Sequence, residues 1–188
     1  MSVVENILDF NKEFVKNKEY EKYATSKFPD KKMVILTCMD TRLLEMLPKA
    51  MNLKNGDAKI VKNAGAMIKD PFESAMSSII VALYELKAEE VVVIGHYGCG
   101  MTGMNADSIV DKALKGGMES STLDNLRESG VDVDKWLQGF DDVEENVRNS
   151  VDIIRKHPFL PANTPVHGLA ISPETGELTV IDMEKSRD

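Results

Sequence analysis

Ten residues near the middle of the chain read Val91-Val92-Val93-Ile94-Gly95-His96-Tyr97-Gly98-Cys99-Gly100. Four β-branched apolar residues in succession predict a strand that is buried on both faces, as strands of a parallel sheet are. The apolar run ends at a histidine, and a cysteine follows three residues later. In α/β proteins, sites form just beyond the carboxyl ends of parallel strands, so this segment is a candidate site.

A second apolar run, at 33–37, ends in a similar way, because Cys38-Met39-Asp40-Thr41-Arg42 follows it directly. Strands and helices alternate along the rest of the chain. We expect strands at 33–37, 59–62, 91–95, 166–171 and 178–182, and helices at 2–16, 43–52, 70–87, 105–115, 120–128, 133–138 and 143–154. This alternation predicts an α/β fold with a mainly parallel sheet and an antiparallel last strand.

Two helix boundaries depend on proline. Asp70-Pro71 predicts a helix whose N-cap is Asp70 and whose first helical residue is Pro71. Pro48 lies inside the expected helix at 43–52 and predicts an interruption there.

Composition narrows the class of protein. The chain has 188 residues, of which 43% are hydrophobic and 29% are charged, which predicts one compact domain over residues 1–188. The net charge of -8, with no basic run, argues against nucleic acid as a partner. No apolar run approaches the roughly 20 residues of a membrane helix, and no export signal is visible, so we expect a cytoplasmic protein without a membrane partner.

The chain contains two cysteines, Cys38 and Cys99, which in a cytoplasmic protein are more often core, catalytic or metal-binding thiols than a disulfide. If the two strands are close in the sheet, both thiols and His96 converge. Two cysteines and a histidine are a zinc ligand set, and three protein ligands leave the open position that is typical of catalytic zinc. Either cysteine alone would be interpreted as an inert core thiol, but their joint placement after strands favours a metal site.

Asp40 and Arg42 are two residues apart, so in an extended segment their side chains lie on the same side. A guanidinium can hold a carboxylate in a fixed orientation through paired hydrogen bonds. Beside an open zinc position, Asp40 could accept a proton from bound water, or could itself bind zinc as a fourth ligand and close the site. The alternative is a surface ion pair of little energetic value.

The segments Cys38-Met39-Asp40-Thr41-Arg42-Leu43 and His96-Tyr97-Gly98-Cys99-Gly100-Met101 resemble the two zinc-site motifs of β-class carbonic anhydrases. Lys62-Asn63-Ala64-Gly65 is similar to the loop after that family's second strand, and His157-Pro158 and Glu174-Thr175-Gly176-Glu177 resemble its C-terminal part. The likeness extends from about 33 to 183 and is greatest to the compact prokaryotic, archaeal-type subgroup. It implies a four-stranded parallel sheet with an antiparallel edge strand, helices on both faces, and an N-terminal helical dimerisation arm over 1–30.

The resemblance also implies an activity. One zinc ion per chain would be bound by Cys38, His96 and Cys99, with Asp40 and Arg42 as a catalytic dyad, for the reversible hydration of carbon dioxide to bicarbonate and a proton. The implied assembly is a homodimer or a dimer of dimers. Two alternatives stay open: hydrolysis of carbon disulfide or carbonyl sulfide on the same zinc site, and a non-enzymatic zinc-binding module that has kept the fold.

Overall fold

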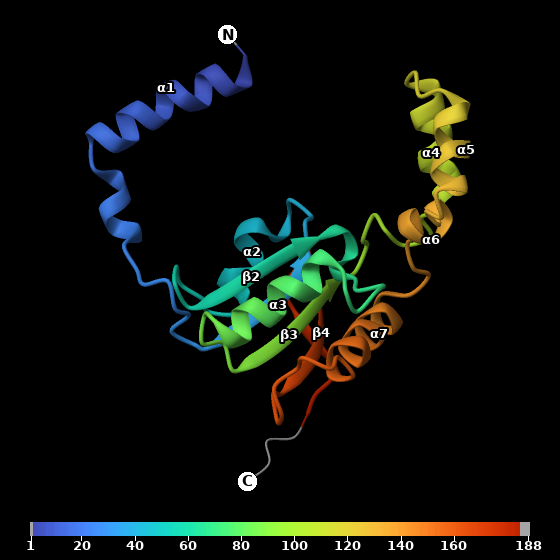
Figure 1. The fold of residues 1–188 in the computed structure, drawn as a ribbon. Coiled ribbons are helices and arrows are strands. Elements are labelled where there is room, and N and C mark those ends of the chain that lie inside the picture. Colours follow the sequence, from blue (N-terminus) through green and yellow to red (C-terminus); the bar gives the residue numbers. More distant parts are fainter. Residues whose placement is uncertain (1, 185–188) are drawn as a thin grey trace.

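The computed structural model describes residues 2–184 and contains one five-stranded sheet (Figure 1). The strands are β1 (Met33–Cys38), β2 (Ala58–Asn63), β3 (Glu90–His96), β4 (Val166–Ile171) and β5 (Leu178–Asp182). Their order across the sheet is β2-β1-β3-β4-β5, and the first four are parallel whereas β5 pairs antiparallel with β4. The predicted α/β class, with four parallel strands and an antiparallel edge strand, is confirmed.

Helices cover both faces of the sheet, as predicted. They are α1 (Val3–Lys16), α2 (Leu43–Ala50), α3 (Ser74–Tyr84), α4 (Ala106–Lys115), α5 (Ser120–Glu128), α6 (Val133–Leu137) and α7 (Val143–Arg155), with short 3-10 turns η1 (Glu19–Tyr23) and η2 (Ala64–Ala66). Successive strand residues point to opposite faces. Val34 of β1 therefore packs in the core beneath α3 and α7, while Ile35 packs with α2 on the other face.

Helix α7 packs closely on the sheet because β3 carries a glycine beneath it. A Cβ atom at Gly95 would be 2.8 Å from Cγ2 of Val147 and 3.0 Å from Cγ1 of Val143. The absence of a side chain there lets the first two turns of α7 rest directly on the end of β3. This contact brings α7 next to the candidate site, since Gly95 immediately precedes His96.

The two helix boundaries that were predicted from proline residues differ in the structure. Helix α3 begins at Ser74, with Glu73 as its N-cap, and not at Pro71. The Asp70 carboxylate accepts the N–H of Phe72 at 2.8 Å, which forms a separate turn before the helix. The interruption expected at Pro48 is also wrong, because α2 continues to Ala50. Leu44, whose carbonyl loses its usual donor, is exposed, so that carbonyl can bond to solvent.

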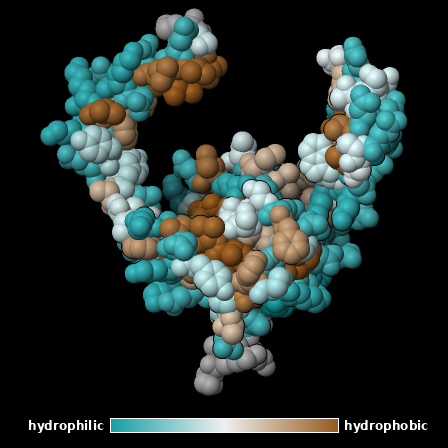
Figure 2. Space-filling model, in the orientation of Figure 1, coloured by the Kyte–Doolittle hydropathy of each residue, from teal (hydrophilic) through white to brown (hydrophobic). Residues whose placement is uncertain are grey.

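Two helical segments project from opposite sides of the body (Figure 1). One consists of α1 and η1, and the other of α4, α5 and α6. No residue of α1 is buried, and its apolar side chains form a patch on the side that faces the gap between the two segments (Figure 2). Among the described residues, no helix is both long and apolar enough to cross a membrane.

Candidate metal centre

Strands β1 and β3 are neighbours in the sheet, with Thr37 opposite Ile94. The segments that follow them therefore emerge side by side at one edge. Cys38 is the last residue of β1 and His96 the last of β3, and Cys99 lies in the turn that follows. The sequence predicted convergence of these residues only if the two strands lie close in the sheet, and they do.

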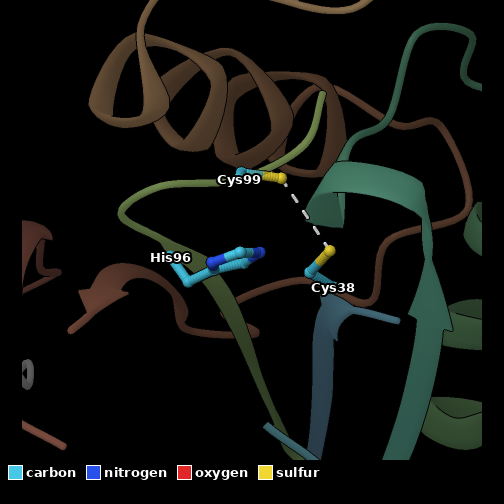
Figure 3. Close-up of side chains that lie close together, drawn as sticks. All are labelled: Cys38, His96 and Cys99. Carbon is cyan, nitrogen blue, oxygen red and sulfur yellow. Dashed lines mark hydrogen bonds between the residues drawn. The ribbon is translucent and has the colours of Figure 1, made fainter. Parts of the chain in front are cut away.

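The three side chains point toward one another in a buried space (Figure 3). Their ligand atoms all lie within 4.8 Å of one another, and the two sulfur atoms are 3.9 Å apart. Each residue is at most 6% exposed. Such a spacing is what one tetrahedral metal ion requires of three ligands, and the soft thiolate and imidazole donors suit zinc.

His96 supplies a direct test of whether these residues fit a metal ion. Its Nδ1 is 3.0 Å from the carbonyl oxygen of Tyr97, which places the ring proton on Nδ1. Its Nε2 is then a bare acceptor, and it is buried without a hydrogen-bond partner within the described part of the chain. A buried polar atom without a partner is costly. A cation between Nε2 and the two sulfur atoms would satisfy it, and a hydrogen bond from the second ring nitrogen is the usual support of a metal-binding histidine.

The pKa values of the three side chains also favour a bound cation. Hydrogen bonding to Cys99 lowers the pKa of Cys38 to about 4, and the nearby His96 ring and two backbone N–H groups act in the same direction, against the effect of burial. The contact with Cys38, together with burial, raises the pKa of Cys99. Proximity to Cys38 raises the pKa of His96. A metal cation would replace the thiol protons, since a coordinating thiol is deprotonated outright.

Asp40 and Arg42 lie at the rim of this cluster. The Arg42 guanidinium donates from Nε to Oδ1 of Asp40 at 3.0 Å and from Nη2 to Oδ2 at 2.9 Å. These bonds lower the pKa of Asp40 to about 2, so the carboxyl is ionised throughout the physiological range. Its Oδ2 is 3.7 Å from Nε2 of His96, which directs the carboxylate at the space between the ligands. Arg42 also donates to the carbonyl of Gly98 at 3.1 Å and so connects the two strand-end segments.

A third segment, which the sequence did not assign to the site, also contacts it. The backbone N–H of Gly65, in η2 after β2, donates to Sγ of Cys38 at 3.4 Å. The loop that contains Gly65 is held by two buried polar side chains of α7, Asn146 and Ser150. The sequence contains one feature that could have indicated these two residues, because both interrupt the apolar stripe of that helix, one turn apart.

Comparison with known proteins identifies the family to which this arrangement belongs. The sequence model of the carbonic anhydrase family matches residues 33–178. The chain belongs to the β-carbonic anhydrase family. A Bacillus subtilis protein named "Putative carbonic anhydrase YvdA" is 59% identical over 176 residues, which cover 94% of this chain and 89% of that protein.

A solved structure supports the same assignment. The crystal structure of beta-carbonic anhydrase isoform I from Trichomonas vaginalis superimposes with a TM-score of 0.89 at 35% identity, covering 98% of this chain and 100% of that chain. The chain is also similar to a protein with a different name. A carbon disulfide hydrolase of Acidithiobacillus thiooxidans is 32% identical over 163 residues, covering 79% of this chain and 76% of that protein. All five predicted site residues lie inside the range matched to the family.

Proposed function

We propose that the protein is a zinc-dependent carbonic anhydrase, which converts carbon dioxide and water reversibly into bicarbonate and a proton. The observation that carries the proposal is the buried, unpartnered Nε2 of His96, which faces the sulfur atoms of Cys38 and Cys99 beside a carboxylate held by Arg42. A structural zinc site needs no such carboxylate, so the Asp40–Arg42 pair favours catalysis over a non-enzymatic module.

Each of the five residues has a distinct role in this proposal. Cys38, Cys99 and His96 would bind one zinc ion, the histidine through Nε2. When bound, zinc would act as a Lewis acid that makes water nucleophilic near neutral pH. Asp40 stays ionised and accepts a hydrogen bond from the attacking group, which orients its lone pair toward the substrate carbon. Arg42 fixes both oxygens of Asp40, and the same carboxylate could become a fourth ligand and close the site.

Two measurements test this proposal, namely zinc content by elemental analysis and carbon dioxide hydration by stopped flow. Asp40→Asn keeps the shape of the side chain but removes the charge, so it should retain zinc and lose most activity. Cys99→Ser should lose zinc and activity together. A wild-type protein that binds one zinc per chain but does not hydrate carbon dioxide would contradict the proposed reaction.

Carbon disulfide hydrolysis is the second candidate activity. It is supported by the relative from Acidithiobacillus thiooxidans that bears this name. Carbon disulfide, like carbon dioxide, is a linear molecule without net dipole, so the same site chemistry applies to both. Assaying sulfide release alongside bicarbonate formation, on the same zinc-loaded preparation, decides which substrate is preferred.

We also propose that residues 1–188 form one zinc domain that assembles as a homodimer or a dimer of dimers through the arm at 1–30. The arm's apolar residues Val3, Ile7 and Phe10 are between 60% and 75% exposed, and solvent exposure of such a patch is unfavourable in an isolated chain. Phe10→Asp should lower the mass measured by light scattering from that of a dimer, whereas Asp9→Asn, on the polar side of the same helix, should not. The cytoplasmic location predicted from the sequence stays a prediction.

A further inference from the structure

The loop after β2 contacts the metal centre through its backbone. Gly65 has a φ of +84°, a conformation that favours glycine, and its N–H is aimed at Sγ of Cys38. The contact is buried. A hydrogen bond to a ligand atom orients that ligand and withdraws charge from it, so the position of this N–H affects how Cys38 binds a metal.

The position of Gly65 depends on its own carbonyl group. Nδ2 of Asn146 donates to the Gly65 oxygen at 3.0 Å, and Asn146 is 6% exposed. One turn further along α7, the hydroxyl of Ser150 accepts the N–H of Ile68 at 3.0 Å. Asn63 closes the loop from the other side, because its side chain bonds both backbone groups of Met67. The loop is therefore held at both ends, and Asn146 acts on the residue that touches the sulfur.

A purely structural role is the ordinary explanation of a buried, hydrogen-bonded asparagine. Two observations indicate that Asn146 also has a role at the metal centre. The side chain lies on the apolar stripe of α7 between Val143 and Val147, where a hydrophobic residue would pack without needing a partner. Its partner is also the one residue of the described loop whose N–H reaches Cys38, so Asn146 holds the same residue that supplies the donor to the metal ligand.

We propose that Asn146 is a positioning residue of the metal centre, which holds Gly65 so that its N–H remains directed at the Cys38 sulfur and thereby strengthens metal binding. The inference rests on the zinc site of the proposed function, but not on the reaction catalysed there. Among the described residues, the Asn146 side chain forms no hydrogen bond with the three ligand side chains or with the Asp40 carboxylate, so it acts through Gly65.

The test compares Asn146→Leu, which keeps the branching and the number of heavy atoms and removes the donor, with Val151→Ala as the matched control. Val151 is a buried residue of the same helix that bonds no part of the loop. Asn146→Ser, which is too short to reach Gly65, serves as the second variant if the leucine variant does not fold. Zinc affinity is measured by competition with a chromophoric chelator, and the sulfur–metal charge-transfer band is recorded after replacement of zinc by Co²⁺.

We expect both Asn146 variants to bind zinc about 10–100-fold more weakly than the wild type, the range typical for loss of an outer hydrogen-bond partner. Their charge-transfer band should move to longer wavelength, because a thiolate without its N–H donor holds its electrons less tightly. Val151→Ala should leave both readouts unchanged. Wild-type affinity and an unmoved band in the Asn146 variants, or the same losses in Val151→Ala, would overturn the inference. If the wild-type protein bound no zinc, both this inference and the proposed function would be overturned. If it bound zinc but did not hydrate carbon dioxide, only the proposed function would fail. The zinc affinity and the charge-transfer band would still decide the inference about Asn146.

Discussion

Replacement of Gly65 by alanine tests how closely the loop after β2 is fitted to the site. The new Cβ atom would lie 2.8 Å from Cε1 of Phe140 and 3.3 Å from Cβ and Cγ of Met101. Alanine at a left-handed φ of +84° costs about 1–2 kcal/mol, and overpacking in a filled site costs about 1–3 kcal/mol. We therefore expect Gly65→Ala to reduce the free energy of unfolding by roughly 2–5 kcal/mol.

A matched control separates the backbone cost from the packing cost. Gly176 has a similar φ of +77°, but a Cβ there would meet the Cβ of Ala50 at 3.4 Å and the Cγ of Met46 at 3.9 Å, which are ordinary contact distances. Gly176→Ala should therefore lose only about 1–2 kcal/mol. At this chain length, each kcal/mol corresponds to roughly 2–4 °C in Tm, so Gly65→Ala should melt about 4–20 °C below the wild type. Urea unfolding of zinc-saturated samples, followed by circular dichroism, measures all three proteins. If the two glycine variants lost the same free energy, the close approach of Phe140 would have no energetic effect and the reasoning would be refuted.

Four other predictions concern charge and anchoring. Arg42→Gln should retain zinc but lower carbon dioxide hydration at least tenfold, because Asp40 loses the two hydrogen bonds that hold its carboxylate. Unchanged turnover would show that Arg42 has no part in the mechanism. Activity of the wild type should rise between about pH 6.5 and about pH 9, because two thiolates neutralise the zinc charge and weaken it as a Lewis acid; a flat profile contradicts this. Hydrogen bonds from Arg155 lower the pKa of Asp182, so their stabilisation is present above the ordinary carboxyl pKa and is lost as pH falls through the lowered one. Asp182→Asn should therefore be about 1–2 kcal/mol less stable than the wild type at pH 7, and the difference should shrink as the pH falls below the ordinary carboxyl pKa, measured by urea unfolding at each pH. Lys69→Met should speed hydrogen exchange in α6, because Lys69 Nζ donates to the carbonyls of Lys135 and Trp136 at the end of that helix; unchanged exchange would show that this anchor is not needed.

The parts of the fold that the sequence predicted are those with a local cause. Strand β3 follows from a run of β-branched residues, and the helices of the polar segment at 105–138 follow from their own periodicity. The start of α3 was mispredicted because two local arrangements compete at Asp70: it can cap a helix, or it can bond the N–H of Phe72 in a turn, as it does. Such a choice depends on how the preceding loop is held, which lies outside the local pattern.

The metal centre shows the same division between local and long-range causes. Cys38, His96 and Cys99 could be nominated from residue type and position after strands, but their convergence depends on β1 and β3 being neighbours although β2 separates them in the chain. Asn146 was visible only as a polar residue on an apolar helix face. Its partner is a backbone carbonyl more than eighty residues away, and a backbone atom has no sequence signature.

Charge balance explains how several charged side chains and a metal ion can lie together at the carboxyl ends of β1 and β3. If zinc is held as proposed, two thiolates cancel its two positive charges, and Arg42 cancels Asp40, so the five side chains and the ion sum to zero. A neutral cluster avoids most of the cost of burying separate charges, provided that each polar atom has a partner. The Gly65 N–H, the Tyr97 carbonyl and the Gly98 carbonyl are those partners, for Cys38, His96 and Arg42 respectively. All three are backbone groups of loops that follow β2 or β3, so the parallel sheet supplies both the ligands and their support from one edge.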